Sequence, residues 1–170
     1  MRRRKVIVLI IALLTLLIPS SLLWYRGHYS MTVARSYSVG APSSAQRVLI
    51  ATQGSRFKDA LVAGLIRHLL SRSVYVSVID VSGLPGVKAG DWTAIVLIHT
   101  WEYSRPPADA RVFLDRLSER QRVIVVTTSG NGKETMPGVD AISAASVMSD
   151  PPAPLAAVTG RIDALLNAAR

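Results

Sequence analysis

Residues 47–57 of the chain, with the sequence RVLIATQGSRF, carry the pattern that decides the fold. The apolar run over residues 48–51 is typical of a buried strand, and it stops at the turn-forming residues 52–55. From Phe57 onward, apolar residues recur at helical spacing, and Lys58 is expected to point away from the core. This stretch therefore predicts a strand, a short turn and a helix in succession.

The alternation of strand and helix patterns continues toward the C-terminus. Apolar, β-branched runs predict further strands over residues 74–81, 93–98, 123–127 and, more weakly, 139–147. Apolar residues at helical spacing predict helices over 110–117 and 155–166, each following a pair of prolines, and no helix is expected between the last two strands. Because strands that alternate with helices form βαβ units, we expect an α/β fold, a three-layer parallel sheet of about five strands.

The first 26 residues have the pattern of a membrane anchor. Four basic residues, Arg2 to Lys5, precede an apolar stretch over residues 6–25, which as a helix would span about 30 Å, the thickness of a bilayer's hydrocarbon core. A secretory signal peptide is the alternative, but residues 19–21 make a poor cleavage site. We therefore expect residues 1–26 to be an uncleaved single-pass anchor that contacts the membrane through residues 6–25. The excess of basic residues before the span predicts a cytoplasmic N-terminus and an extracytoplasmic domain.

Residues 27–46 lack a helical or strand period, so we expect a flexible stalk there and a single domain over 47–170. The net charge of +9 is concentrated at the N-terminus, because residues 1–46 hold six of the 20 basic side chains and none of the 11 acidic ones. The domain is thus only weakly basic, and nucleic acid is not an expected partner. The sequence leaves the oligomeric state open.

Metal and disulfide chemistry have little support in the sequence. The chain has no cysteine, which excludes disulfides and thiolate metal sites. Its three histidines, His28, His68 and His99, lie far apart without ligand spacing, so no metal site is expected.

Ligands of open parallel sheets bind beyond the carboxyl ends of the strands, where three loops of this chain should meet. The first, residues 52–57, offers backbone N–H groups, hydroxyls, the Arg56 guanidinium and a helix N-terminus to a phosphate, although by itself this pattern is more typical of a structural turn. The second, residues 99–107, carries Trp101 and Tyr103, which could stack on a flat ligand or, for Trp101, pack over the sheet edge.

The third loop, residues 127–134, contains Gly132-Lys133 but is not a nucleotide-binding P-loop. Thr127 stands where the first glycine of that motif belongs, and Glu134 stands where a hydroxyl should bind magnesium.

Together these loops resemble those of the flavodoxin-like family, including the single-domain quinone-linked protoporphyrinogen oxidases. Residues 47–57 look like the first strand and phosphate loop of that family, residues 91–103 like its third strand and ring-stacking loop, and residues 107–117 like the helix that ends in a Phe-Leu pair. The resemblance implies FMN as cofactor. The residues that it implies for cofactor binding are Thr52, Gln53, Gly54, Ser55, Arg56, Phe57, Thr100, Trp101, Glu102, Tyr103, Thr128, Ser129, Gly130 and Asn131.

The phosphate loop departs from the family form S-x-T-G-N-T, which leaves two classes of function. Ala51 and Gln53 stand where hydroxyls are expected, and Arg56 replaces the final threonine. The first class is a membrane-anchored, FMN-binding electron carrier or reductase, which would be an FMN-dependent oxidoreductase acting with a redox partner protein or a quinone. The second is a flavin-free relative that mediates protein interactions at the membrane.

Overall fold

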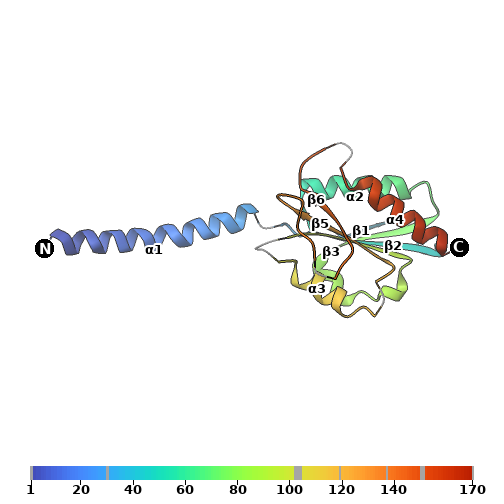
Figure 1. Ribbon diagram of the computed structural model, residues 1–170, viewed down its shortest axis with the longest axis horizontal. Helices are drawn as coiled ribbons and strands as arrows, with labels where there is room; N and C mark the ends of the chain where they lie inside the picture. Colours follow the sequence, from blue (N-terminus) through green and yellow to red (C-terminus); the bar gives the residue numbers. More distant parts are fainter. Residues whose placement is uncertain are drawn as a thin grey trace. The chain divides into compact units, whose positions relative to one another are not determined.

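The computed structural model describes residues 2–29, 31–101, 105–118, 120–136, 138–149 and 152–169 (Figure 1). It divides the chain into two units, Met1–Ser30 and Met31–Arg170, which are described here one at a time.

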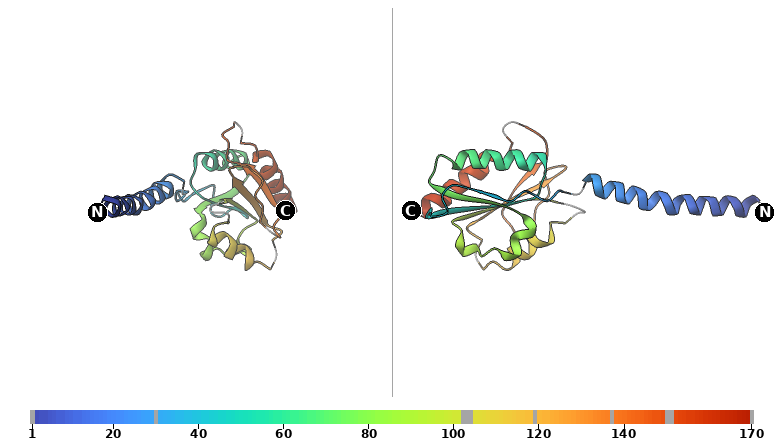
Figure 2. Two further views of the ribbon diagram at one scale, coloured as in Figure 1. Left: turned by 60° about the vertical axis from the view of Figure 1, so that its left-hand side comes forward. Right: turned by 180° about the vertical axis from the view of Figure 1, so that it is seen from behind.

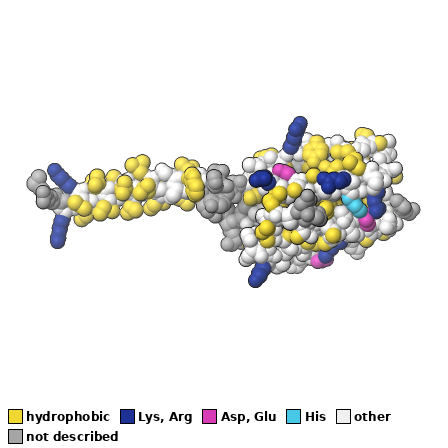
Figure 3. All heavy atoms as spheres, turned by 90° about the horizontal axis from the view of Figure 1, so that it is seen from above, with side chains coloured by type: hydrophobic (Ala, Val, Ile, Leu, Met, Phe, Trp, Pro, Cys, Tyr) yellow, Lys and Arg dark blue, Asp and Glu magenta, His cyan; other side chains and the backbone are white. Residues whose placement is uncertain are grey.

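The first unit is the helix α1, Arg2–Tyr29. Its segment Arg3–Trp24 is long and apolar enough to cross a membrane, a property that signal sequences share. Figure 3 shows apolar side chains along this helix and basic side chains at its N-terminal end. The Thr15 and Ser20 hydroxyls donate to the carbonyls of Ile11 and Leu16, both at 2.7 Å, so the helix satisfies these hydroxyls itself.

The second unit is built on a six-stranded sheet in the order β1-β3-β2-β4-β5-β6. Its strands are β1 (Tyr37–Val39), β2 (Gln46–Thr52), β3 (Val74–Asp80), β4 (Ala94–Thr100), β5 (Val123–Ser129) and β6 (Ala141–Ala145). The strands from β2 to β6 are all parallel, and β1 pairs antiparallel with β3 at one edge. The five parallel strands have the flavodoxin-like order, which reverses between β2 and β4. The predicted parallel α/β sheet is confirmed, with one antiparallel edge strand added.

Helices cover both faces of the sheet, as Figures 1 and 2 show. The helices α2 (Arg56–Leu69) and α4 (Leu155–Ala168) pack on one face, and α3 (Ala108–Asp115) packs on the other beside two 3-10 turns, Val81–Gly86 and Ala89–Asp91. Successive residues of β4 point alternately to the two faces, so Val96 and Ile98 join the α2/α4 cluster while Ile95 and Leu97 join the α3 cluster. Every residue of β4 is buried, as expected for a central parallel strand.

The structure differs from the expected flexible stalk over residues 27–46. Helix α1 continues to Tyr29, and the second unit already begins at Met31. Residues 31–35, called here the N-terminal strap, bond to the sheet's carboxyl edge, and β1 follows directly. A three-residue strand with mostly exposed side chains has no hydrophobic period, so sequence patterns do not reveal it.

The connection from β5 to β6 contains no helix among its described residues, in agreement with the sequence prediction. Met136 takes a helix's place by packing into the α3 cluster, and the Arg120 guanidinium donates to the Gly138 carbonyl at 3.1 Å. Gly132 adopts a φ of +69°, which side-chain-bearing residues rarely do.

Candidate functional site

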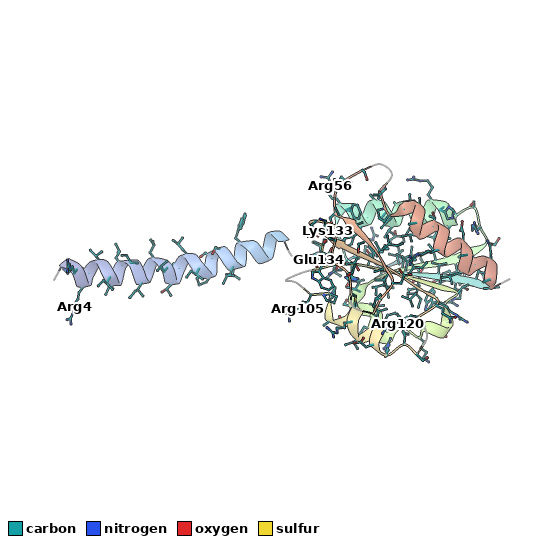
Figure 4. All side chains as sticks on the ribbon, viewed as in Figure 1. Arg4, Arg56, Arg105, Arg120, Lys133 and Glu134 are labelled. Carbon is teal, nitrogen blue, oxygen red and sulfur yellow. The ribbon has the colours of Figure 1, made fainter. Side chains whose placement is uncertain are left out.

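The three predicted loops do meet at the carboxyl edge of the parallel strands. The strand order reverses between β2 and β4, so a crevice between their following loops is the expected ligand site of this fold. Figure 4 shows Arg56, Lys133, Glu134 and Arg105 at this end of the domain, whereas Arg120 lies away from them.

The first loop is organised as the N-terminal cap of α2. The Ser55 side chain accepts from the Lys58 N–H at 3.3 Å, and the Ser55 carbonyl accepts from the Asp59 N–H at 2.8 Å. Phe57 is buried in the domain, and Thr52 is buried with its hydroxyl donating to the Gln53 carbonyl at 3.2 Å. Arg56, the first residue of α2, is exposed. The Ser55 hydroxyl therefore already accepts a hydrogen bond from a backbone N–H of α2.

Buried polar groups tie the ends of β2, β4 and β5 together. The Gln53 side-chain oxygen accepts from the Thr100 N–H at 2.7 Å. The hydroxyls of Thr100 and Thr128 share a hydrogen bond of 2.8 Å, and the Thr128 hydroxyl also donates to the His99 carbonyl at 3.2 Å. Gln53, Thr100 and Thr128, all expected to contact a cofactor, thus stabilise the contact between neighbouring strands.

Lys58 lies buried between the first loop and the end of β4, and sequence reasoning placed it on the wrong side of its helix. Its side chain is only 1% exposed. The ammonium group donates to the Thr100 hydroxyl at 2.5 Å and lies 3.0 Å from the Met31 sulfur and 3.5 Å from the Ser55 hydroxyl. The sequence did indicate a buried position for Lys58, because Leu61, Val62 and Leu65 follow it at the spacing of one helix face.

The N-terminal strap bonds to the first loop and to the end of β3. Thr32 and Gly54 form an antiparallel bridge in which the Gly54 N–H donates to the Thr32 carbonyl at 2.7 Å and the Thr32 N–H donates to the Gly54 carbonyl at 3.2 Å. The Ala34 N–H donates to the buried Asp80 carboxylate at 2.7 Å. A Cβ atom at position 54 would lie 2.4 Å from the Thr32 hydroxyl oxygen, so only glycine permits this approach.

A cavity of about 360 Å³ lies beside the strap. Its lining includes Thr32, Tyr37, Gly54 and Asp59. Partial burial and the Asp59 carboxylate raise the pKa of Tyr37 above its ordinary value of 10.0. The cavity is thus bounded by the strap and by the first loop together.

Trp101 lies at the end of β4 and faces the α3 side of the sheet. The half-buried Trp101 side chain packs against the α3 cluster. The Trp101 backbone N–H donates to the Thr128 carbonyl at 2.8 Å, which continues the pairing of β4 with β5. Packing of Trp101 over the sheet, one of the two alternatives that the sequence left open, is present in the structure. Glu102 and Tyr103, the other expected ring contacts, lie outside the described residues.

The third loop is a self-contained turn. The Ser129 hydroxyl donates to the Asn131 side-chain oxygen at 2.9 Å and accepts from the Gly132 N–H at 2.9 Å. The same Asn131 oxygen accepts from the Lys133 N–H at 3.0 Å, and Gly130 is exposed at the tip. The polar groups of Ser129 and Asn131 therefore hold the turn itself.

His99 is a buried histidine on the α3 face of β4. Its Nε2 atom lies 3.2 Å from the Thr127 hydroxyl, and its Nδ1 atom has no hydrogen-bond partner among the described residues. Burial lowers the pKa of His99 to about 4, and the positive charge of Lys58 acts in the same direction. The imidazole is therefore neutral at physiological pH. The described residues contain no group of three His, Asp or Glu side chains that could hold a metal ion.

Comparison with known proteins identifies the fold. Neither a protein-family model nor a curated protein matches the chain. Among solved structures, it is similar to the metal-soaked Flv1 flavodiiron core from Synechocystis sp. PCC6803, with 17% identity over 74% of this chain and a TM-score of 0.58. A second is an oxidoreductase from Corynebacterium diphtheriae, with 12% identity, coverage of 72% of this chain and 93% of that chain, and a TM-score of 0.41.

The chain covers only 37% of the Flv1 structure, and the low identity shows a shared fold alone. The second unit therefore has a flavodoxin-like fold.

Proposed function

We propose that the chain is a flavin-free flavodoxin-like module that α1 holds at a membrane and that works by binding other proteins. The observation that carries this proposal is the strap, which uses the Gly54 N–H of the first loop. In an open α/β sheet this loop would supply the N–H donors for a phosphate. A chain that satisfies the Gly54 donor itself has one donor fewer to offer an anionic cofactor.

Two polar side chains at the start of α2 support the same interpretation. The Ser55 hydroxyl accepts from the Lys58 N–H, and the Lys58 ammonium is turned inward onto the Thr100 hydroxyl. A phosphate at this loop would have to replace the Thr32 carbonyl at Gly54. As arranged, the residues of this loop do not fit an FMN phosphate.

The ring side of the crevice also favours a flavin-free module. Trp101, the described aromatic of the second loop, packs its half-buried side chain against the α3 cluster. Thr100 and Thr128 bond to each other, and Ser129 and Asn131 stabilise their own turn. These contacts stabilise the loops without a bound flavin ring.

The second candidate is the FMN-binding electron carrier, acting with a redox partner protein or a quinone. The specific observation in its favour is Arg56, whose exposed guanidinium lies at the N-terminus of α2, where an anion is favoured by the helix dipole. This candidate requires the strap to leave Gly54.

Membrane attachment belongs to both candidates. Helix α1 has the length and apolarity of a span, and its basic N-terminal residues favour a cytoplasmic N-terminus with an extracytoplasmic domain.

The test is an FMN titration of the full chain in detergent micelles, followed by fluorescence and by the absorbance spectrum after desalting. We expect no quenching of FMN and no retained flavin bands. Retained flavin would replace this proposal by the electron carrier. In that case Arg56→Ala should weaken FMN about ten- to a hundredfold and spare riboflavin, which lacks the phosphate. Trp101→Ala should then weaken both ligands, because they share the ring.

A further inference from the structure

The strap is an extended peptide already bonded to the carboxyl edge of the sheet. It makes a two-way backbone pair with Gly54 through Thr32, and it donates the Ala34 N–H to the Asp80 carboxylate. The Met31 sulfur lies over the Lys58 ammonium. One isolated antiparallel bridge and one bond to a carboxylate thus hold the strap, as main-chain bonds hold a bound extended peptide while a few side-chain positions select it.

The strap is held mainly by polar contacts, which can be exchanged. Of its residues only Ala34 is a buried apolar side chain, whereas Val33 is 80% exposed. Segments with few buried apolar contacts open at a small fraction of the free energy that unfolds the whole domain. The groups beneath the strap, by contrast, need partners when water is excluded, because Lys58 and Asp80 are polar and buried.

From these contacts we infer that the surface around Gly54 and Asp80 is a docking site for an extended segment of a partner protein, with the strap as its occupant in cis. This inference rests on the proposed function and names the kind of partner that the module would bind.

The seated strap defines the chemistry of the partner segment. Its first residue carries a thioether or another long, weakly polar side chain over Lys58, as Met31 does. Its second residue keeps both backbone groups for Gly54. Its fourth residue is small and keeps its N–H for Asp80, which excludes proline there. The third residue is free to vary, because Val33 points to solvent.

The test uses the full chain in detergent micelles and a fluorescent synthetic peptide with the sequence of residues 31–36, MTVARS. In the variant Thr32→Pro/Ala34→Pro the strap loses the two N–H groups that bind Gly54 and Asp80. Because a site that is closed most of the time binds with an affinity reduced by its open fraction, we expect the peptide to bind this variant at least about tenfold more tightly than the wild type.

Two matched controls locate the peptide. Adding Gly54→Ala to the variant places a methyl group where the Thr32 side chain and carbonyl of the strap lie, so it should abolish binding. A peptide with proline at its fourth position lacks the N–H for Asp80 and should bind at least about tenfold more weakly. Near-ultraviolet circular dichroism checks that each variant keeps the native domain.

Several results would overturn the inference. They are a peptide that binds neither chain, binding that survives Gly54→Ala, and a variant that takes up FMN and not the peptide. A wild-type chain that dimerises through its strap, with the dimer lost in Thr32→Pro/Ala34→Pro, would assign the site to a second copy and would also refute the inference. FMN uptake by the wild-type chain refutes the proposed function, whereas failure of the peptide alone refutes only the docking site.

Discussion

Thr32 and Gly54 lie 22 positions apart and pair backbone to backbone, with N–H···O distances of 2.7 and 3.2 Å. The pair joins the start of the second unit to the loop that resembles a flavodoxin phosphate loop. It places a piece of the chain itself at the position where the fold usually receives a ligand. How firmly this pair holds decides whether the Gly54 N–H is available to a ligand.

Replacing Gly54 with alanine should release the strap. The new Cβ atom would lie 2.4 Å from the Thr32 hydroxyl oxygen and 2.9 Å from its carbonyl oxygen. We expect the amide of Ala34 to exchange with deuterium at least about tenfold faster, a loss of about 1.4 kcal/mol of local protection. Gly160→Ala is the matched control, because no atom lies within 4 Å of its added methyl group. Unchanged protection of Ala34 in Gly54→Ala would show that the pair does not hold the strap.

Acid should destabilise the domain through His99. Its pKa is about 4 in the folded protein against an ordinary 6.5, so between these values the unfolded chain binds the proton and the folded one does not. The contribution of the neutral His99 imidazole to the free energy of unfolding is fully present above pH 6.5, and it falls by up to about 3 kcal/mol as the pH drops to 4. Urea unfolding at pH 7.5 and pH 4.5 measures it. The variant His99→Gln should lose this part of the pH dependence, and an unchanged dependence would contradict the assignment.

Removing the Lys58 charge should raise the pKa of His99. The ammonium group is one cause of the lowered value, but burial is the larger cause. In Lys58→Met we therefore expect the pKa of His99 to rise above 4 and to stay below 6.5. The imidazole signals in an NMR pH titration report it. Lys88→Met, at an exposed position, is the control. A value equal to the wild type in Lys58→Met would contradict the electrostatic coupling.

Two glycines with similar backbone angles should differ in their tolerance of alanine. Gly132 and Gly138 have φ of +69° and +71°, so alanine costs about 1–2 kcal/mol of strain at either position. At Gly132 the Cβ atom would also lie 2.5 Å from the Ala145 nitrogen in β6, whereas at Gly138 no atom lies within 4 Å. We expect Gly132→Ala to reduce the free energy of unfolding by at least about 1 kcal/mol more than Gly138→Ala, as measured with urea. Equal losses would mean that the turn moves away from β6 at no cost.

Helix α1 should hold the chain in a membrane. The wild type is expected to stay in the membrane pellet after extraction with alkaline carbonate. Leu9→Arg combined with Leu14→Arg should release a large fraction, because each arginine near the centre of a span costs about 2.5 to 3.5 kcal/mol. Leu70→Arg, at an exposed position just after α2, is the control and should remain in the pellet. Release of the wild type as a chain shortened near residue 21 would show a cleaved signal instead.

The orientation of the chain can be measured separately. If the domain is extracytoplasmic, protease added to intact cells should degrade it. A domain that becomes sensitive only after lysis would place it in the cytoplasm.

Local sequence patterns were sufficient for most of the helices and strands. The apolar runs that became β2, β4 and β5 are buried on both faces, and the periodic segments that became α2 and α4 each have one apolar side. These signals are local, because the period of an element depends on its own residues and on which face meets the core. The alternation of the two element types then implied a parallel sheet, as found.

The directions of the side chains near the first two loops were harder to predict from the sequence, although the periodicity of β4 and α2 contained part of the information. Trp101 has the same parity along β4 as Ile95 and Leu97, so strand alternation places all three on the α3 face. Lys58 occupies the apolar side of α2 by its spacing to Leu61 and Leu65. Periodicity therefore indicated the observed face for both residues. For Lys58 the expectation that lysine is solvated favoured the other face, and for Trp101 packing over the sheet edge was one of two alternatives.

The strap and β1 could be found only in three dimensions. Thr32 meets Gly54, and Ala34 meets Asp80, 46 positions away, through backbone atoms that every residue type shares. Such contacts leave no periodic pattern in the residues that make them, since the energy comes from N–H and C=O groups and from proximity that the rest of the fold creates. The sequence was sufficient to predict a parallel α/β sheet and the three loops at its carboxyl edge. Tertiary structure alone decided that the chain's own strap bonds to the first of these loops and to the end of β3.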